Sequence, residues 1–140
     1  MFSKACEYAI KAMILVESCN NMERKISLAE IAEAIDSPVA YTSKILQQLR
    51  KNKFLISTIG AKGGFSIPKG RSVNLSEIVA VIDGDVFNRC VLGLPTCSSQ
   101  NPCPLHNQYV KIKESQYRLM LKTSIQEFSS SLKKKRISLK

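Results

Sequence analysis

Three cysteines and the single histidine of the chain lie close together in the sequence, and their side chains are suited to metal chemistry. Six residues separate Cys90 from Cys97, five separate Cys97 from Cys103, and His106 follows Cys103 after two residues. Structural zinc sites ordinarily use cysteine pairs two to four residues apart. The wider spacing favours a loop around something larger than one ion. Because an iron–sulfur cluster takes thiolate ligands and tolerates histidine, the three cysteines are predicted cluster ligands and His106 a candidate fourth ligand.

Two other interpretations of these cysteines stay open. Three cysteines and a histidine are also a reasonable zinc site, and three free thiols are the ingredients of a direct redox switch. A disulfide does not fit a reducing cytosol, and a cytoplasmic location is what we expect. Lys4 and Glu7 interrupt any apolar signal segment at the start, and no apolar run approaches the roughly 20 residues that span a bilayer.

The chain is strongly basic. It has 140 residues, with 21 lysines and arginines against 11 acidic residues and a formal net charge of +10. Such an excess of positive charge attracts polyanions, of which nucleic acid is the commonest. A hydrophobic content of 44% is enough for a packed core. Part of the charge lies in residues 133–136, so a merely solvated basic tail is the alternative.

The first half of the chain predicts three helices followed by a β-hairpin. Apolar residues recur at helical spacing between Ser3 and about Asn20. Ser27 and Glu30 have the spacing of a capping box that begins a second helix. A third helix is predicted from 38 to 53, and strands at 54–59 and 65–67 flank a glycine-rich turn. This is the element order of a winged helix-turn-helix, so the predicted fold is mainly α with a small β-hairpin.

The second half predicts a short helix, the cysteine loop and one long helix. Asn74 or Ser76 begins the short helix, which stops at residues 83–84, and the loop runs to Pro104. A single helix is predicted from Leu105 to about Leu132, with two apolar stripes that suit packing on its own domain and on a second chain. We therefore expect a homodimer. The predicted division is 1–70 for the winged helix-turn-helix, 71–104 for the short helix and cysteine loop, and 105–140 for the dimerisation helix and basic tail.

The start of the third helix is the segment that a helix-turn-helix places in the major groove. Hydroxyl groups there suit base edges or phosphates, and small residues allow close approach. Basic and amide side chains follow one and two turns later, and the glycine-rich wing offers backbone N–H groups and a lysine. A winged helix used only for protein contacts is the alternative. The predicted DNA-binding residues are Ser27, Val39, Ala40, Tyr41, Thr42, Ser43, Lys44, Gln47, Arg50, Lys51, Gly60, Lys62 and Gly63.

Several motifs together resemble the Rrf2 family of bacterial transcriptional regulators over nearly the whole chain. They are the opening segment 3–9, Ser-Leu-Ala-Glu-Ile-Ala at 27–32, Tyr41, Leu-Arg-Lys-Asn at 49–52, Gly-Ala-Lys-Gly-Gly-Phe at 60–65, Leu-Ser-Glu-Ile at 75–78, and the three cysteines. The resemblance implies a homodimeric winged-helix regulator of promoter DNA, with crossed C-terminal helices and an iron–sulfur cluster that senses iron–sulfur, redox or nitric oxide status.

The resemblance also implies ligands for that cluster. Cys90, Cys97 and Cys103 fall on the family's three cluster cysteines. His106 falls where some members use histidine as the fourth ligand of a 2Fe–2S cluster, and Glu7 where others use a carboxylate of the partner chain for a 4Fe–4S cluster. We favour His106 and 2Fe–2S. Two positions differ from many members: Ile59 replaces an arginine before the wing, and Ser43 replaces an acidic residue.

An enzyme is not expected. The sequence has no glycine-rich cofactor motif, no paired catalytic carboxylates and no second histidine to serve as a base. We expect no small-molecule substrate and no membrane partner. A cluster-free thiol regulator or a zinc-containing regulator on the same fold remains the alternative function.

Overall fold

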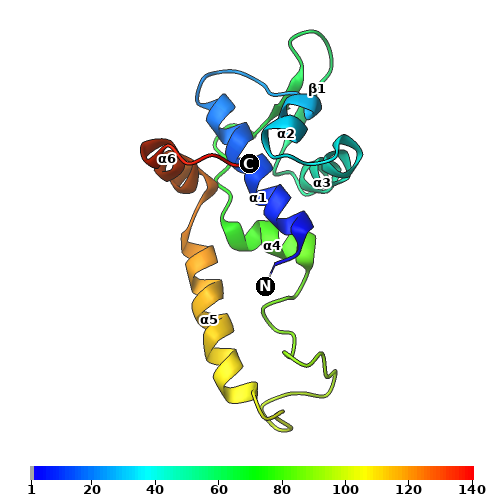
Figure 1. Cartoon of the computed structure of the whole chain (residues 1–140), viewed down its shortest axis with the longest axis vertical. Coiled ribbons are helices and arrows are strands. Elements are labelled where there is room, and N and C mark those ends of the chain that lie inside the picture. Colours follow the sequence, from blue (N-terminus) through cyan, green and yellow to red (C-terminus); the bar gives the residue numbers. More distant parts are fainter. Residues whose placement is uncertain (1) are drawn as a thin grey trace.

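The computed structural model describes residues 2–140 as a mostly helical protein with one antiparallel hairpin (Figure 1). Within this range the elements follow in the order α1 (Lys4–Asn20), α2 (Leu28–Ala34), α3 (Val39–Lys51), β1 (Ile56–Thr58), β2 (Gly64–Ser66), α4 (Leu75–Asp83), α5 (His106–Lys122) and α6 (Ile125–Lys135). The predicted fold class is confirmed: the first five elements are a winged helix-turn-helix. No helix in residues 2–140 is both long and apolar enough to cross a membrane.

Local hydrogen bonds begin the first two helices where the sequence predicts. The Ser3 hydroxyl accepts from the backbone N–H of Cys6 at 3.1 Å and so begins α1. The Ser27 hydroxyl accepts from the Glu30 N–H at 3.2 Å, and the Glu30 carboxylate accepts from the Ser27 N–H at 2.9 Å. This reciprocal pair fixes the start of α2. The core between α1, α2 and α3 contains Met13, Ile31, Leu46 and Leu49, which are all fully buried.

The hairpin is shorter than predicted because its flanking residues belong to the core. Phe54 and Leu55 are buried beneath the sheet, and only Ile56–Thr58 pairs with Gly64–Ser66. Gly64 has a φ of +136°, and a Cβ there would lie 2.7 Å from the carbonyl oxygen of Ile26. Glycine is therefore required where the wing backbone meets the segment before α2, to which the Phe65 N–H donates at 2.8 Å.

The prediction of one uninterrupted helix from Leu105 to about Leu132 is wrong. Thr123 adopts an extended conformation, and Ser124 caps a new helix through a capping box with Glu127. The chain also pairs here with the segment before α4, since the Leu75 N–H donates to the Thr123 carbonyl at 3.0 Å and the Ile125 N–H to the Val73 carbonyl at 2.8 Å. Tertiary hydrogen bonds thus replace the helical ones at the break.

The two halves of that predicted helix have different surroundings. α6 packs against α1, where Ile125 is fully buried and the Ser129 and Ser18 hydroxyls are 2.9 Å apart. α5 instead extends away from the body alongside the cysteine loop (Figure 1). It contacts α4 on one side, while Ile112 and Leu119 are 62% and 63% exposed. α5 therefore presents large apolar side chains to solvent in the single chain.

Candidate metal centre and nucleic-acid interface

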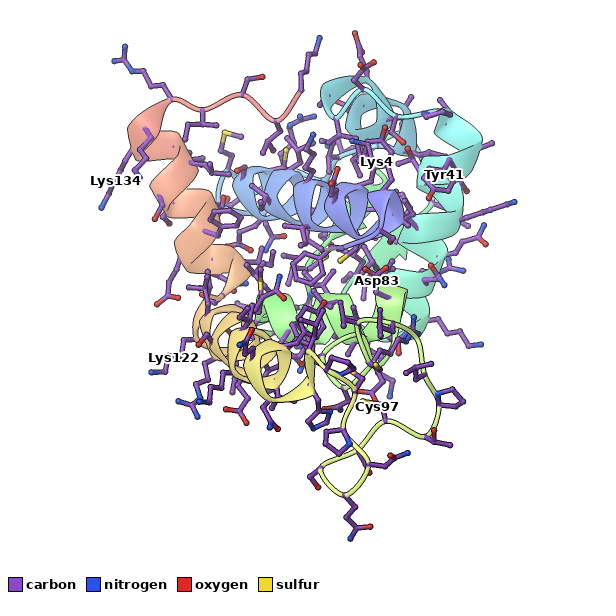
Figure 2. All side chains as sticks on the ribbon, turned by 60° about the horizontal axis from the view of Figure 1, so that its bottom comes forward. Lys4, Tyr41, Asp83, Cys97, Lys122 and Lys134 are labelled. Carbon is purple, nitrogen blue, oxygen red and sulfur yellow. The ribbon has the colours of Figure 1, made fainter. Side chains whose placement is uncertain are left out.

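The cysteine loop connects α4 to α5 and contains no helix or strand. Short turns shape it: the Gly93 N–H donates to the Cys90 carbonyl at 3.0 Å, and the His106 N–H donates to the Cys103 carbonyl at 3.0 Å. This second bond places His106 at the first position of α5, directly behind the last cysteine. In Figure 2 the loop that carries Cys97 lies apart from Tyr41 of α3.

The loop brings the three cysteine sulfur atoms together. They all lie within 4.8 Å of one another, and the Sγ atoms of Cys90 and Cys103 are 3.7 Å apart. The Nδ1 atom of His106 lies 3.2 Å from the Sγ atom of Cys97, which also accepts from the Cys103 N–H at 3.5 Å. The structure therefore gathers the four residues that the sequence singles out into one half-buried cluster.

The backbone prepares Cys90 to ionise. The N–H groups of Leu94 and Leu92 point at its sulfur atom and lower the pKa of the Cys90 thiol to about 7. A thiolate is the form of cysteine that binds metals. This lowered pKa favours the ligating form of Cys90.

This donor set fits a thiophilic metal group. Two thiolates on one tetrahedral ion, at a metal–sulfur distance of about 2.3 Å, lie about 3.8 Å apart, and the Cys90–Cys103 separation of 3.7 Å matches that value. Soft thiolate ligands select zinc and iron–sulfur clusters over hard cations. The four groups line a cavity of about 40 Å³. Because the loop has no regular backbone structure, it can adjust to an inorganic core larger than one ion.

Glu7 lies outside this cluster in its own chain. It is exposed on the first turn of α1, and its carboxylate is 2.9 Å from the Lys4 ammonium, which lowers the pKa of Glu7. A role for Glu7 as a ligand requires the partner chain and remains a prediction.

The outer face of α3 is open to solvent. Most of its predicted DNA contacts are exposed, and Ser43 is half-buried. The Tyr41 ring packs edge to face on the Tyr8 ring of α1, with centroids 6.0 Å apart. That contact fixes the direction of Tyr41 at the start of the helix. The exposed positions are Val39, Ala40, Tyr41, Lys44, Gln47, Arg50 and Lys51.

Thr42 is a correction to the predicted set. It is 0% exposed, and its hydroxyl donates to the Pro38 carbonyl at 3.0 Å and lies 2.9 Å from the Ser37 hydroxyl. The position faces the core side of α3, with Ile45 and Leu49. Thr42 therefore stabilises the corner between α2 and α3, and its side chain is not part of the exposed face of α3.

Hydrogen bonds connect the wing to α3 and to the segment before α2. The Arg50 guanidinium donates to the Ser57 hydroxyl of β1 at 3.0 Å, and the Lys25 ammonium donates to the Thr58 hydroxyl at 2.9 Å. Gly60 and Lys62 are exposed at the tip, and Gly63 is half-buried. Ile59, where many family members have arginine, is fully exposed.

A groove of about 470 Å³ runs between the wing and the segment before α2. Lys62 and Gly63 line it with Ser27, whose hydroxyl is engaged in its cap. Arg24 and Lys25, which the sequence analysis did not single out, also line it, as do Glu23 and Glu30. The Arg24 guanidinium lies 2.8 Å from the Glu30 carboxylate. In the sequence, Arg24 and Lys25 stand just before the capping box of α2.

An exposed third helix flanked by a two-stranded wing defines the class of winged helix-turn-helix DNA-binding proteins. Within that class, residues 2–131 match the family Rrf2, described as "Iron-dependent Transcriptional regulator". The chain therefore belongs to the Rrf2 family, which confirms the resemblance. The family and the chain's relatives are transcriptional regulators, not enzymes.

Individual relatives agree with this assignment. The chain is 27% identical over 117 residues to a putative HTH-type transcriptional regulator of Aquifex aeolicus, covering 81% of this chain and 80% of the relative. It is 27% identical over 108 residues to IscR of Klebsiella pneumoniae, covering 76% of this chain and 66% of the relative. An rrf2-like regulator of Rhodobacter capsulatus is 33% identical over 89 residues, covering 61% and 59%.

Solved structures share the fold. T. potens IscR superposes with a TM-score of 0.77 at 20% identity, covering 99% of this chain and 92% of that one. CymR, described as the global cysteine regulator of B. subtilis, gives a TM-score of 0.76 at 19% identity, covering 94% and 97%. This chain therefore has the same fold as these solved structures from α1 to α6.

Proposed function

We propose that this Rrf2-family regulator binds promoter DNA as a cytoplasmic homodimer and holds an iron–sulfur cluster on Cys90, Cys97 and Cys103. The observation that carries the proposal is the convergence of the three sulfur atoms within 4.8 Å. The family description as iron-dependent and the IscR relatives support the same cofactor. When bound, the cluster would supply a group whose state depends on iron, oxidant or nitric oxide.

His106 is the fourth ligand that we favour, with a 2Fe–2S cluster. Its Nδ1 atom is already 3.2 Å from the Cys97 sulfur atom, whereas Glu7 of the same chain is paired with Lys4. A 4Fe–4S cluster with the Glu7 carboxylate of a second copy is the alternative assignment.

The uncovered surface of α5 supports a dimer. Large apolar side chains on a helix that projects from the body are unfavourable in water unless a second copy covers them. Such a dimer would present two recognition helices to a two-fold-related DNA site. The exposed apolar residues are Leu105, Ile112, Tyr117, Leu119 and Leu121.

Communication between the two sites would pass through α4 and across the dimer. In one chain the wing and the cysteine loop lie at opposite ends of the long axis (Figure 1). α4 packs against α1, α3 and α5. A change in the loop and the start of α5 would therefore reach the recognition helix through α4, with a coupling of about 1–3 kcal/mol.

Anaerobic reconstitution with iron and sulfide tests the cofactor. We expect visible absorption with stoichiometric iron and sulfide in the wild type and loss of both in Cys97→Ala. His106→Ala should change the spectrum, and Glu7→Ala should not. A colourless protein with stoichiometric zinc would overturn the cluster assignment and favour a zinc-containing regulator, and absence of any metal would favour a thiol regulator.

A further inference from the structure

Lys113 of α5 is a buried lysine without a carboxylate partner. Its exposed fraction is 8%, and among residues 2–140 it is the only buried lysine or arginine. None of the salt bridges in that range includes it. Its Nζ atom donates to the Arg89 carbonyl at 2.5 Å and lies 5.2 Å from the centroid of the Tyr109 ring.

These two contacts do not balance the charge of the ammonium group. An ammonium carries three N–H donors, and one carbonyl and one ring face provide only dipoles and a quadrupole. Burying a charge without a counter-charge is unfavourable, which is why lysine is almost never buried unpaired. The Lys113 ammonium therefore lacks the carboxylate that would balance its charge, and a nearby negative group would stabilise it.

The candidate metal centre lies on the same side of α5. Lys113 follows His106 by seven residues, so both occupy one face of the helix. Lys113 and His106 line the same small cavity as Cys90, Cys97 and Cys103. The carbonyl that accepts from Lys113 belongs to Arg89, the residue directly before Cys90. Lys113 thus lines the same cavity as the three cysteines, and its ammonium binds the backbone directly before Cys90.

We propose that Lys113 is the charge-compensating residue of this metal centre. The idea rests on the proposed function only in requiring a metal group on the three cysteines. Cysteines release their protons when they bind a metal, and three thiolates around a divalent cation leave one net negative charge. The Lys113 ammonium, whose side chain lines the same cavity, offsets that charge in a half-buried site where water screens it poorly.

Cobalt(II) binding to the reduced, metal-free protein tests this role. Co²⁺ takes tetrahedral thiolate and imidazole ligands, and its visible absorption reports occupancy. Lys113→Met removes the charge and keeps most of the side-chain shape, Lys113→Arg keeps the charge, and Lys111→Met removes an exposed charge from the same helix. We expect Lys113→Met to weaken Co²⁺ binding at least about tenfold, while the other two variants stay within about threefold of the wild type.

Thermal unfolding of the metal-free variants separates charge from architecture. Replacing a buried charge that lacks a counter-charge by an apolar group removes its desolvation cost. We expect this gain to offset the lost bond to the Arg89 carbonyl, so metal-free Lys113→Met should unfold no lower than the wild type. Unchanged Co²⁺ affinity in Lys113→Met would overturn the proposal. So would equally weak binding by Lys113→Arg, or a lowered unfolding temperature of metal-free Lys113→Met.

The two proposals fail in different ways. If the wild type binds Co²⁺ but assembles no cluster with iron and sulfide, the cluster assignment fails and the Lys113 comparison still decides its role. If the wild type assembles a cluster and Lys113→Met binds Co²⁺ normally, only the role of Lys113 fails. A wild type that binds neither overturns both.

Discussion

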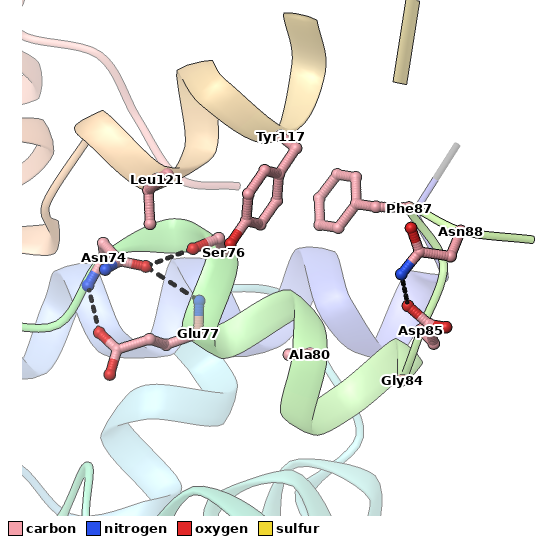
Figure 3. A pocket seen from close by; sticks show the side chains of 10 residues that line it. All are labelled: Asn74, Ser76, Glu77, Ala80, Gly84, Asp85, Phe87, Asn88, Tyr117 and Leu121. Atoms are coloured by element: carbon pink, nitrogen blue, oxygen red, sulfur yellow. Dashed lines mark hydrogen bonds between the residues drawn. The ribbon is translucent and has the colours of Figure 1, made fainter. Parts of the chain in front are cut away.

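The Tyr117 ring of α5 packs edge to face on the Phe87 ring, with centroids 5.2 Å apart and an angle of 64° between the ring planes (Figure 3). On its other side Phe87 contacts the Phe2 ring, with centroids 6.0 Å apart. Three aromatic rings thus connect α5, the start of the cysteine loop and the segment before α1. Phe87 and Tyr117 also line a hollow of about 650 Å³ between α4 and α5.

Shortening the central ring should loosen this connection. Aromatic pairs contribute about 0.5–1.5 kcal/mol beyond the area that they bury, so we expect Phe87→Leu to lower the free energy of unfolding by about 1 kcal/mol. Urea unfolding of the metal-free protein at a fixed concentration measures it. Leu92→Ala, at an exposed loop position, should change the free energy by less than about 0.5 kcal/mol. Equal values for the two variants would contradict the role of the ring stack.

The break between α5 and α6 depends on Ser124. Its hydroxyl accepts from the Glu127 N–H at 3.1 Å, and loss of such a cap costs about 1 kcal/mol. Ser124→Ala should therefore lower the unfolding free energy by about that amount. Ser131→Ala, an exposed position inside α6, should be neutral or slightly stabilising. If Ser124→Ala is as stable as the wild type, the cap does not hold the break.

Glu30 should make the stability sensitive to acid. Hydrogen bonds from the Ser27 backbone, the Arg24 guanidinium and the Ser27 hydroxyl lower the pKa of Glu30 to about 2, whereas an unperturbed glutamate has a pKa of about 4.3. The stabilisation is therefore present above about pH 4.3 and is lost as the pH falls towards 2. Between pH 5 and 2 the wild type should lose more stability than Glu30→Gln. Chemical unfolding at each pH measures the difference, with Glu33→Gln as control, and parallel curves would contradict the prediction.

Arg50 and Lys62 should contribute to DNA binding through charge. Each replacement by alanine should weaken binding about five- to tenfold and reduce the slope of log affinity against log salt by about one. Fluorescence anisotropy with a duplex selected by the wild type from a random library measures both quantities. Lys134→Ala, in the basic tail, serves as the control. A tail variant as weak as Arg50→Ala would contradict the assignment of the interface to α3 and the wing.

The elements from α1 to α4 could be predicted because local signals fix them. Ser27 and Glu30 set a helix start within four residues, and the glycine-rich run at 60–64 marks the turn between the two strands. The break at Thr123 was missed because pairing with the distant residues Val73 and Leu75 creates it. Ser124 and Glu127 do have the spacing of a capping box, but no proline or glycine near them indicates that the preceding helix ends.

The sequence predicts the candidate ligands of the metal centre but not the residues that surround them. Cysteine spacing identified Cys90, Cys97 and Cys103 because a short loop limits how far apart they can lie. No sequence pattern predicts the burial of Lys113, since a lysine on a mostly polar helix is expected to be exposed to solvent. Its burial depends on how α5 packs against the start of the loop, which is a tertiary property. Thr42 likewise shows that a hydroxyl on the third helix can stabilise the corner between α2 and α3 instead of facing solvent.

The bridge between Asn74 and Ser124 has a consequence for synthesis of the protein. The chain segment from α4 to α5 begins and ends at this bridge. Ile125, which follows the bridge, is fully buried in the core next to α1. We therefore expect the core around α1 to be completed only after α6 has been synthesised. By that time the whole cysteine loop has been synthesised, so completion of this core and any binding of a metal group by the loop can occur together on a newly made chain.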